Sequence, residues 1–137
     1  MNAPAPHIAL RRFYLAIGIG AGIGSLLRYL VALAAAGMAL SPLYGTSAVN
    51  IVGSFIIGLF ATLTEADGRI AMSTLRRQFV MTGFCGGLTT FSSMTLETLL
   101  TFRAAGFWPA LGYLGGLIAA SLLAGYLGIA LARKLNR

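Results

Sequence analysis

The residues of this 137-residue chain that could do chemistry are neutral hydrogen-bonding side chains inside long apolar segments. One is the amide of Asn50, and the others are hydroxyls: Ser54, Thr82, Thr89, Thr90, Ser92, Ser93, Thr95 and Ser121. Replacing the water shell of a small anion takes several hydrogen-bond donors, which an amide and hydroxyls supply. The edges of aromatic rings carry partial positive charge and can face an anion as well. The set therefore favours a small, strongly hydrated anion as ligand.

Each of these polar residues also has a purely structural interpretation. A single Ser or Thr in a helix is more typical of a hydroxyl bonded to its own backbone. The amide of Asn50 is harder to explain in this way, because a buried amide needs several partners. Arg28 either extends to the membrane interface or attracts anions into a vestibule.

Side-chain sets for catalysis or metal binding are missing from the sequence. With the single Cys85 and one histidine, neither an intrachain disulfide nor a Cys or His metal cluster is expected. The chain offers no Ser/His/Asp set and no carboxylate pair, so we expect no enzyme. Glu97, near the end of the third apolar segment, is the acid closest to the middle of any segment.

The position of Glu97 argues against a proton-coupled transporter, and the polar residues argue against a purely structural subunit. A four-span multidrug-type secondary transporter, the alternative function, needs a titratable acid in mid-membrane, which this sequence does not place there. A non-transporting assembly subunit would need neither Asn50 nor an interrupted span.

The composition indicates the fold class that positions these side chains. Hydrophobic residues make up 58% of the chain and charged residues 9%, against roughly 25% charged in soluble domains. A soluble protein of this size could not bury so much apolar surface. Because a span needs about 20 apolar residues, we expect an all-α integral membrane protein with one domain, residues 1–137. Its four predicted spans cover approximately residues 13–36, 43–64, 78–102 and 104–132.

Glycines and threonines set the first and third spans apart. Gly18 with Gly22, and Gly20 with Gly24, repeat every fourth residue, which is typical of close helix packing. Residues 83–90 (GFCGGLTT) have poor helix propensity in mid-span. A broken helix at membrane depth is tolerated only inside protein or beside a wet cavity, and such breaks commonly coordinate ions. A merely kinked packing site is the alternative.

The charges predict the topology. The net charge of +7 arises from basic residues at the ends of apolar runs rather than on a polar domain, which argues against a nucleic-acid partner. The two termini and the loop between the second and third spans share one side of the membrane and carry most of the basic residues. The loops on the other side carry only Arg103, and Arg28 if the first helix ends near it. The positive-inside rule therefore puts both termini in the cytoplasm. Eight of the ten basic residues share that side: Arg11, Arg12, Arg69, Arg76, Arg77, Arg133, Lys134 and Arg137.

Three stretches resemble the Fluc/CrcB family of fluoride channels: residues 24–29 (GSLLRY), 45–55 (GTSAVNIVGSF) and 83–92 (GFCGGLTTFS). The similarity covers nearly the whole chain, including its length, its four spans and the broken third helix. It implies a fluoride-selective channel that passively exports cytoplasmic fluoride across the bacterial plasma (inner) membrane and so relieves toxicity. It also implies an antiparallel, dual-topology dimer in the lipid bilayer, with two fluoride pathways.

The resemblance further implies site residues and a cofactor. A structural sodium ion would lie at the dimer centre, held by the backbone carbonyls of Gly86 and Thr89, and carbonyl cages suit such a hard cation. Met94 stands where the family has a second phenylalanine, and its thioether cannot reproduce a positive ring edge. Leu117 stands where the family often has a serine, and Ser121 fits a later hydroxyl position. The remaining matches are Asn50, Phe91, Thr90, Ser92, Glu97 and Tyr113 along the pathway and Arg28 at its mouth.

The charge asymmetry stands against a dimer built from one chain in both orientations, which should have nearly balanced loop charges. Three explanations are open. The chain inserts in both orientations despite the charge bias, or Arg28, Arg103 and the loop acids offset that bias. In the third, the chain pairs with an oppositely oriented homologue. We favour the homodimer. For Cys85 we expect only a small, buried apolar filler.

Overall fold

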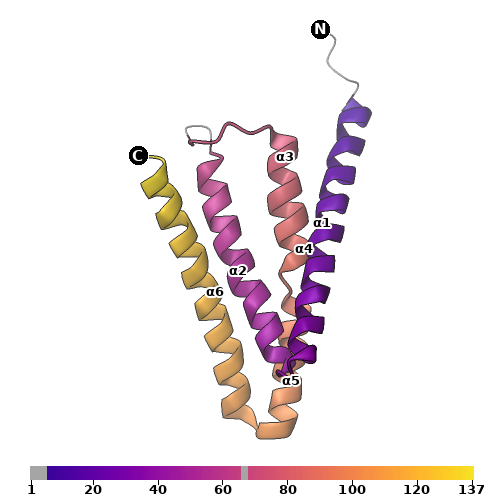
Figure 1. Ribbon diagram of the computed structural model, residues 1–137, viewed down its shortest axis with the longest axis vertical. Helices are drawn as coiled ribbons and strands as arrows, with labels where there is room; N and C mark the ends of the chain where they lie inside the picture. The colour runs from indigo at the N-terminus through magenta and orange to yellow at the C-terminus, as the bar shows by residue number, and fades with distance from the viewer. Residues whose placement is uncertain (1–5, 66–67) are drawn as a thin grey trace.

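A computed structural model of the chain describes residues 6–65 and 68–137, with side chains described from residue 10 onward. Regular structure in these ranges is helical, without strands (Figure 1). Three helices are long and apolar enough to cross a membrane: α1 (Pro6–Gly37), α2 (Pro42–Leu63) and α6 (Phe107–Leu135). The prediction of an all-helical membrane protein is thereby confirmed.

The third predicted span is a broken helix. The chain leaves helical geometry at Thr89 (ψ 155°) and Thr90 (φ −148°, ψ 123°), whereas Gly86 is helical (φ −64°, ψ −34°). The predicted break is therefore confirmed, but it falls on the β-branched pair and not on the glycines. Branching at Cβ favours extended backbone. The parts are α3 (Thr74–Gln78), the π-helical η1 (Phe79–Cys85), α4 (Gly86–Leu88) and α5 (Phe91–Ala105).

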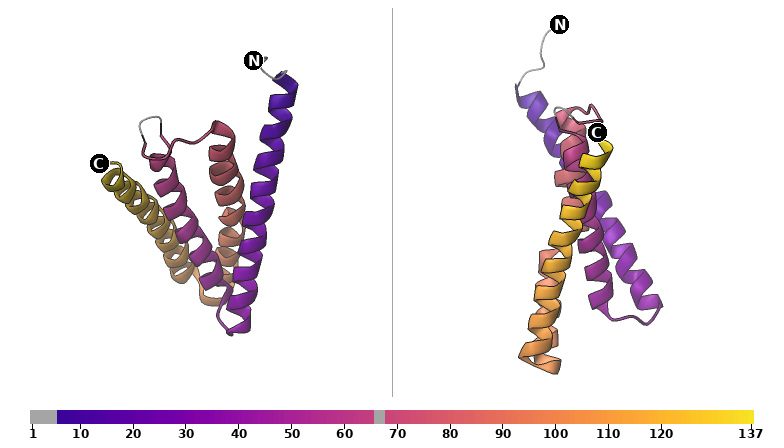
Figure 2. Two further views of the ribbon diagram at one scale, coloured as in Figure 1. Left: turned by 45° about the horizontal axis from the view of Figure 1, so that its top comes forward. Right: turned by 90° about the vertical axis from the view of Figure 1, so that its left-hand side faces the viewer.

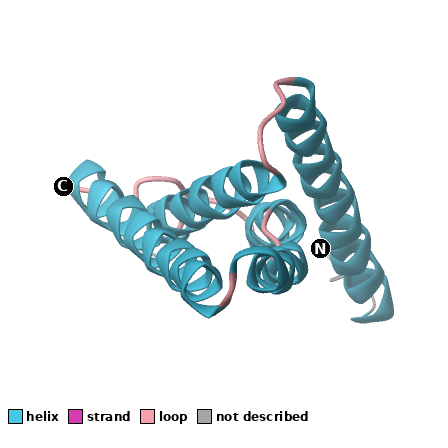
Figure 3. Ribbon diagram, turned by 90° about the horizontal axis from the view of Figure 1, so that it is seen from below, coloured by secondary structure: helices cyan, strands magenta, loops and turns pink. Residues whose placement is uncertain are grey.

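The helices pack in two groups. α2 runs along α6, and α1 packs against η1 and α4, so the broken helix lies between α1 and the α2–α6 pair (Figures 1 and 3). The start of α1, the connection from α2 to α3 and the end of α6 lie together at one end of the molecule (Figure 1). The α1–α2 and α5–α6 connections lie at the other end (Figure 2). We call the first end the basic end, because it carries the eight clustered basic residues.

Glycines allow α1 to approach the broken helix closely. A Cβ atom on Gly20 would lie 2.5 Å from the carbonyl oxygen of Phe79, and one on Gly24 would overlap the carbonyl oxygen of Phe84. By contrast, Gly18 and Gly22 have open space where a Cβ would be. Of the two glycine pairs on α1, only one therefore makes the predicted close helix contact within this chain.

Polar side chains tie the connections together at the basic end. The Nε of Arg77 donates to the Thr64 hydroxyl at 3.1 Å. Asn136 accepts from the backbone N–H of Arg69 at 3.0 Å and donates to the carbonyl of Thr62 at 3.1 Å. The bond from Asn136 satisfies a carbonyl in the last turn of α2, where the helix itself leaves carbonyls without donors.

Replacing Gly24 by alanine tests the contact between α1 and the broken helix. We expect Gly24→Ala to lower the free energy of unfolding by about 1–3 kcal/mol, because the added methyl group overlaps the Phe84 backbone. The measurement is denaturant-induced unfolding of the detergent-solubilised protein. The matched control, Gly22→Ala, adds its methyl group in open space. Equal losses in both variants would contradict this packing.

Candidate functional site

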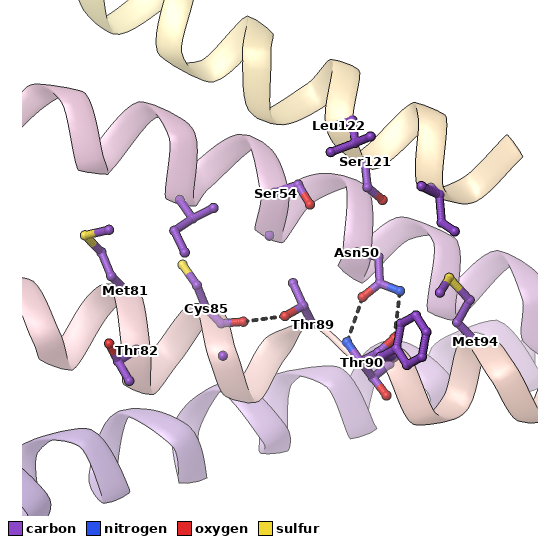
Figure 4. A pocket seen from close by; sticks show the side chains of 15 residues that line it. Asn50, Ser54, Met81, Thr82, Cys85, Thr89, Thr90, Met94, Ser121 and Leu122 are labelled. Atoms are coloured by element: carbon purple, nitrogen blue, oxygen red, sulfur yellow. Dashed lines mark hydrogen bonds between the residues drawn. The ribbon is translucent and has the colours of Figure 1, made fainter. Parts of the chain in front are cut away.

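A cavity of about 630 Å³ lies between the broken helix, α2 and α6. We call it the central cavity (Figure 4). Its wall is mainly apolar, with the hydroxyls of Ser54 and Thr82 among its polar groups. The structure thus brings together side chains from three elements that are far apart in the sequence. Seven of the predicted site residues line it: Asn50, Gly86, Thr89, Thr90, Phe91, Met94 and Ser121.

Asn50 holds the broken helix by its backbone. Its Nδ2 donates to the carbonyl of Thr90 at 2.9 Å, and its Oδ1 accepts from the N–H of Thr90 at 2.7 Å (Figure 4). The side chain thereby supplies partners for backbone groups that the break would leave unpaired at membrane depth. An amide nitrogen carries two N–H donors, so one of them remains for a ligand in the cavity.

The break and the contact of Thr90 with Asn50 leave two backbone carbonyls, those of Gly86 and Thr89, without their helical donors. In a continuous helix the N–H of Thr90 would donate to Gly86, but here it donates to Asn50. The Thr89 carbonyl precedes α5 and accepts no hydrogen bond from the described residues. Gly86 is exposed, and a Cβ there would meet no atom within 4 Å. Two backbone oxygens, the ligand type that hard cations prefer, are therefore available at the break.

Phe91 and Met94 line the cavity from the first turn of α5. They share a helix face, as their spacing of three residues predicts. The side chain of Phe91 is 70% exposed and that of Met94 only 4%. Thr90 caps this helix, because its hydroxyl accepts from the N–H of Ser93 at 3.1 Å.

Glu97 is the centre of a second polar cluster. Its buried carboxylate accepts from the hydroxyl of Thr46 at 2.6 Å and from that of Tyr113 at 2.5 Å. These bonds join α2, α5 and α6. A smaller cavity of about 220 Å³ lies beside the cluster and is lined by Arg28, Glu97, Thr46 and Ser93, among others.

The predicted pathway residues therefore do not all meet in one cavity. Glu97 and Arg28 line the smaller cavity, and Tyr113 reaches this region through its bond to Glu97. Ser92 is exposed and lines neither cavity, although its Oγ lies 3.2 Å from the Thr90 hydroxyl.

Thr46 is the residue that the sequence reasoning overlooked. It lies four residues before Asn50, so both side chains share the face of α2 that meets the broken helix. The four-residue spacing from Asn50 is the sequence feature that could have identified Thr46.

Leu117 and Cys85 are buried, and Cys85 also lines the central cavity. The leucine thus puts an apolar side chain between Tyr113 and Ser121 on α6.

The fold and the site together define a small helical membrane protein of the ion-transporting class, because its helix is broken beside a cavity whose mainly apolar wall carries a few hydrogen-bonding groups. The family model described as CrcB-like protein, Camphor Resistance (CrcB), matches residues 15–129, and the chain belongs to this family. The family resemblance read from the sequence is confirmed.

Curated relatives support the assignment over almost the full length of the chain. The chain is 54% identical over 127 residues to the fluoride-specific ion channel FluC 3 of Brucella abortus, covering 92% of this chain and 93% of the relative. It is 42% identical over 139 residues to the fluoride-specific ion channel FluC 1 of Bradyrhizobium diazoefficiens, covering 100% and 97%.

Replacing Asn50 by leucine tests its contact with the break. We expect Asn50→Leu to lower the free energy of unfolding by about 2–4 kcal/mol, because two buried backbone groups of Thr90 lose their partners. The measurement is unfolding in detergent. Ser54→Ala is the control, since this hydroxyl lines the same cavity but bonds to none of the described residues. An unchanged stability of Asn50→Leu would contradict the assigned contact.

Proposed function

We propose that this chain forms a fluoride-selective channel that passively exports cytoplasmic fluoride across the bacterial plasma (inner) membrane and so relieves fluoride toxicity. Family membership and the names of the relatives support the proposal. The observation that carries it from the structure is the amide of Asn50, fixed against Thr90 with one N–H donor left at the central cavity.

The chemistry of the central cavity suits a small anion. Hydroxyls of Ser54, Thr82 and Ser121 add donors to its apolar wall, and the ring of Phe91 adds a positive edge. The N-terminus of α5, with its partial positive charge, starts at the same break. Among the described residues that line this cavity, none is acidic. An anion that loses its water here therefore meets donors without a repelling carboxylate.

The smaller cavity extends the proposed pathway. We assign Arg28 to its vestibule, where the guanidinium attracts anions, and Glu97, Tyr113 and Ser92 to the polar route between vestibule and break. Glu97 is negative and by itself repels anions. Because Thr46 and Tyr113 donate to its two oxygens, its charge is partly compensated and its position is fixed.

An antiparallel second copy completes the proposed channel. Thr82, Gly86 and Phe91 are exposed although they line the central cavity, so a single chain leaves this side of the cavity open. A second copy packed there in the opposite orientation would close it and give two pathways. The charge asymmetry makes an oppositely oriented homologue the alternative partner.

We also propose a structural sodium ion between the two broken helices. The carbonyls of Gly86 and Thr89 fit such an ion, since hard oxygen donors suit it and the break leaves them without helical donors. When bound, the ion supplies a fixed positive charge that links two sets of carbonyls. Within residues 6–65 and 68–137 no group of three His, Cys, Asp or Glu could hold a metal instead.

Anion efflux from liposomes that contain only the purified chain tests the function. We expect fast fluoride efflux, negligible chloride efflux, and at least a tenfold loss of fluoride efflux in Asn50→Ala. Ser54→Ala is the matched cavity variant: it removes one donor but releases no backbone group of the break, so we expect a smaller loss than in Asn50→Ala. The absence of efflux of either ion from the purified chain would overturn the homodimeric channel, and equal fluoride and chloride rates would overturn its selectivity.

Met94 gives a second functional prediction. We expect Met94→Phe to keep fluoride conduction but change its rate severalfold, because an aromatic edge replaces a soft thioether in the cavity wall. The rate of fluoride efflux at equal protein density is the measurement. An unchanged rate would show that Met94 does not line the route of the ion.

A further inference from the structure

A third hollow lies at the basic end, between α1, α2 and the first part of the broken helix. This groove has a volume of about 420 Å³ and is lined by apolar side chains of α1, α2, η1 and the residues before it, including Ala16, Phe60, Leu75 and Phe79. The one charged residue in its described lining is Arg76. We call it the basic-end groove. It shares no lining residue with the central cavity or the smaller cavity, so the proposed pathway does not use it.

The mouth of the groove is positively charged. Arg76 is exposed and makes no hydrogen bond or ion pair with the described residues, whereas Arg77 bonds to Thr64 and Arg69 to the carbonyl of Leu135. Arg12 precedes Ala16 by one helical turn on the same face of α1 and is also exposed. Two arginines, one in the lining of the groove and one a helical turn from it, therefore lie close to its apolar surface.

The position of the groove indicates what fills it. Ala16 and Phe60 belong to α1 and α2, two helices apolar and long enough to cross a membrane, so this part of the groove lies at the depth of the acyl chains. Arg76 and Arg12 lie nearer the helix ends, where the headgroups of a bilayer lie. Basic pockets between membrane helices bind anionic headgroups for this reason.

We propose that the basic-end groove binds an anionic phospholipid, with one acyl chain between α1, α2 and η1 and its phosphate group against Arg76. Arg12 adds a second positive charge at the phosphate. The apolar lining accounts for the chain of the lipid, and the unpaired guanidinium accounts for its headgroup charge.

Native mass spectrometry of the full-length protein tests the charge. The probes are phosphatidylglycerol and phosphatidylcholine with identical acyl chains. We expect the protein to retain phosphatidylglycerol in preference, and Arg76→Gln to weaken that preference about fivefold, as the loss of one arginine at a membrane surface does. Arg103→Gln, an exposed arginine at the other end of the molecule, is the matched control. An equal loss in Arg103→Gln would show general charge attraction and overturn the groove as the site.

A second variant tests the apolar part without changing charge. Ala16→Phe fills the groove and should reduce the retention of both lipids, whereas Ala119→Phe, at an exposed position of α6, should reduce neither. Unchanged retention in both Arg76→Gln and Ala16→Phe would overturn the proposal. A shift from dimer to monomer in Ala16→Phe, with lipid retention unchanged, would also overturn it and assign the groove to a second copy of the chain.

Discussion

The structure depends on one constraint, which is that backbone groups released at membrane depth must find partners inside the protein. The chain releases them at Thr89 and Thr90, where the third predicted span is broken. Asn50 meets this requirement with two hydrogen bonds to Thr90, so a single amide takes the place of the missing helical bonds. Hydration by bulk water would meet the same need in a soluble protein, but the hydrocarbon core offers none.

The contact of Asn50 with the break fixes how α2 must lie. Gly53, nearly one turn further along, faces Thr89 so closely that a Cβ would overlap the threonine methyl group. One turn earlier, Thr46 donates to Glu97 on α5. One face of α2 therefore carries a hydroxyl, an amide and a glycine that meet the broken helix. Asn50 and Gly53 line the central cavity, and Thr46 lines the smaller one.

Charged side chains among the described residues bond to neutral groups or are exposed. The arginines of the basic end bond to backbone carbonyls and hydroxyls, as Arg69 and Arg77 do, or remain exposed, as Arg76 does. Glu97, the buried acid at the other end of the broken helix, is held by neutral hydroxyls. This separation keeps acidic groups out of the lining of the central cavity among the described residues.

The sequence by itself determined the class of the protein, because hydropathy acts on each segment alone and needs no knowledge of its neighbours. The break within residues 83–90 was predictable for the same reason, since helix propensity is local; the choice of Thr89 and Thr90 over the glycines was not. Only the tertiary structure decided that Thr46 meets Glu97, 51 residues away, and that Asn50 meets Thr90, 40 residues away. Periodicity assigns a residue to a face of its own helix, but the rotation of that helix against the others is set by packing. Close contacts such as Gly24 against Phe84 fix that rotation, and with it which polar groups share a cavity.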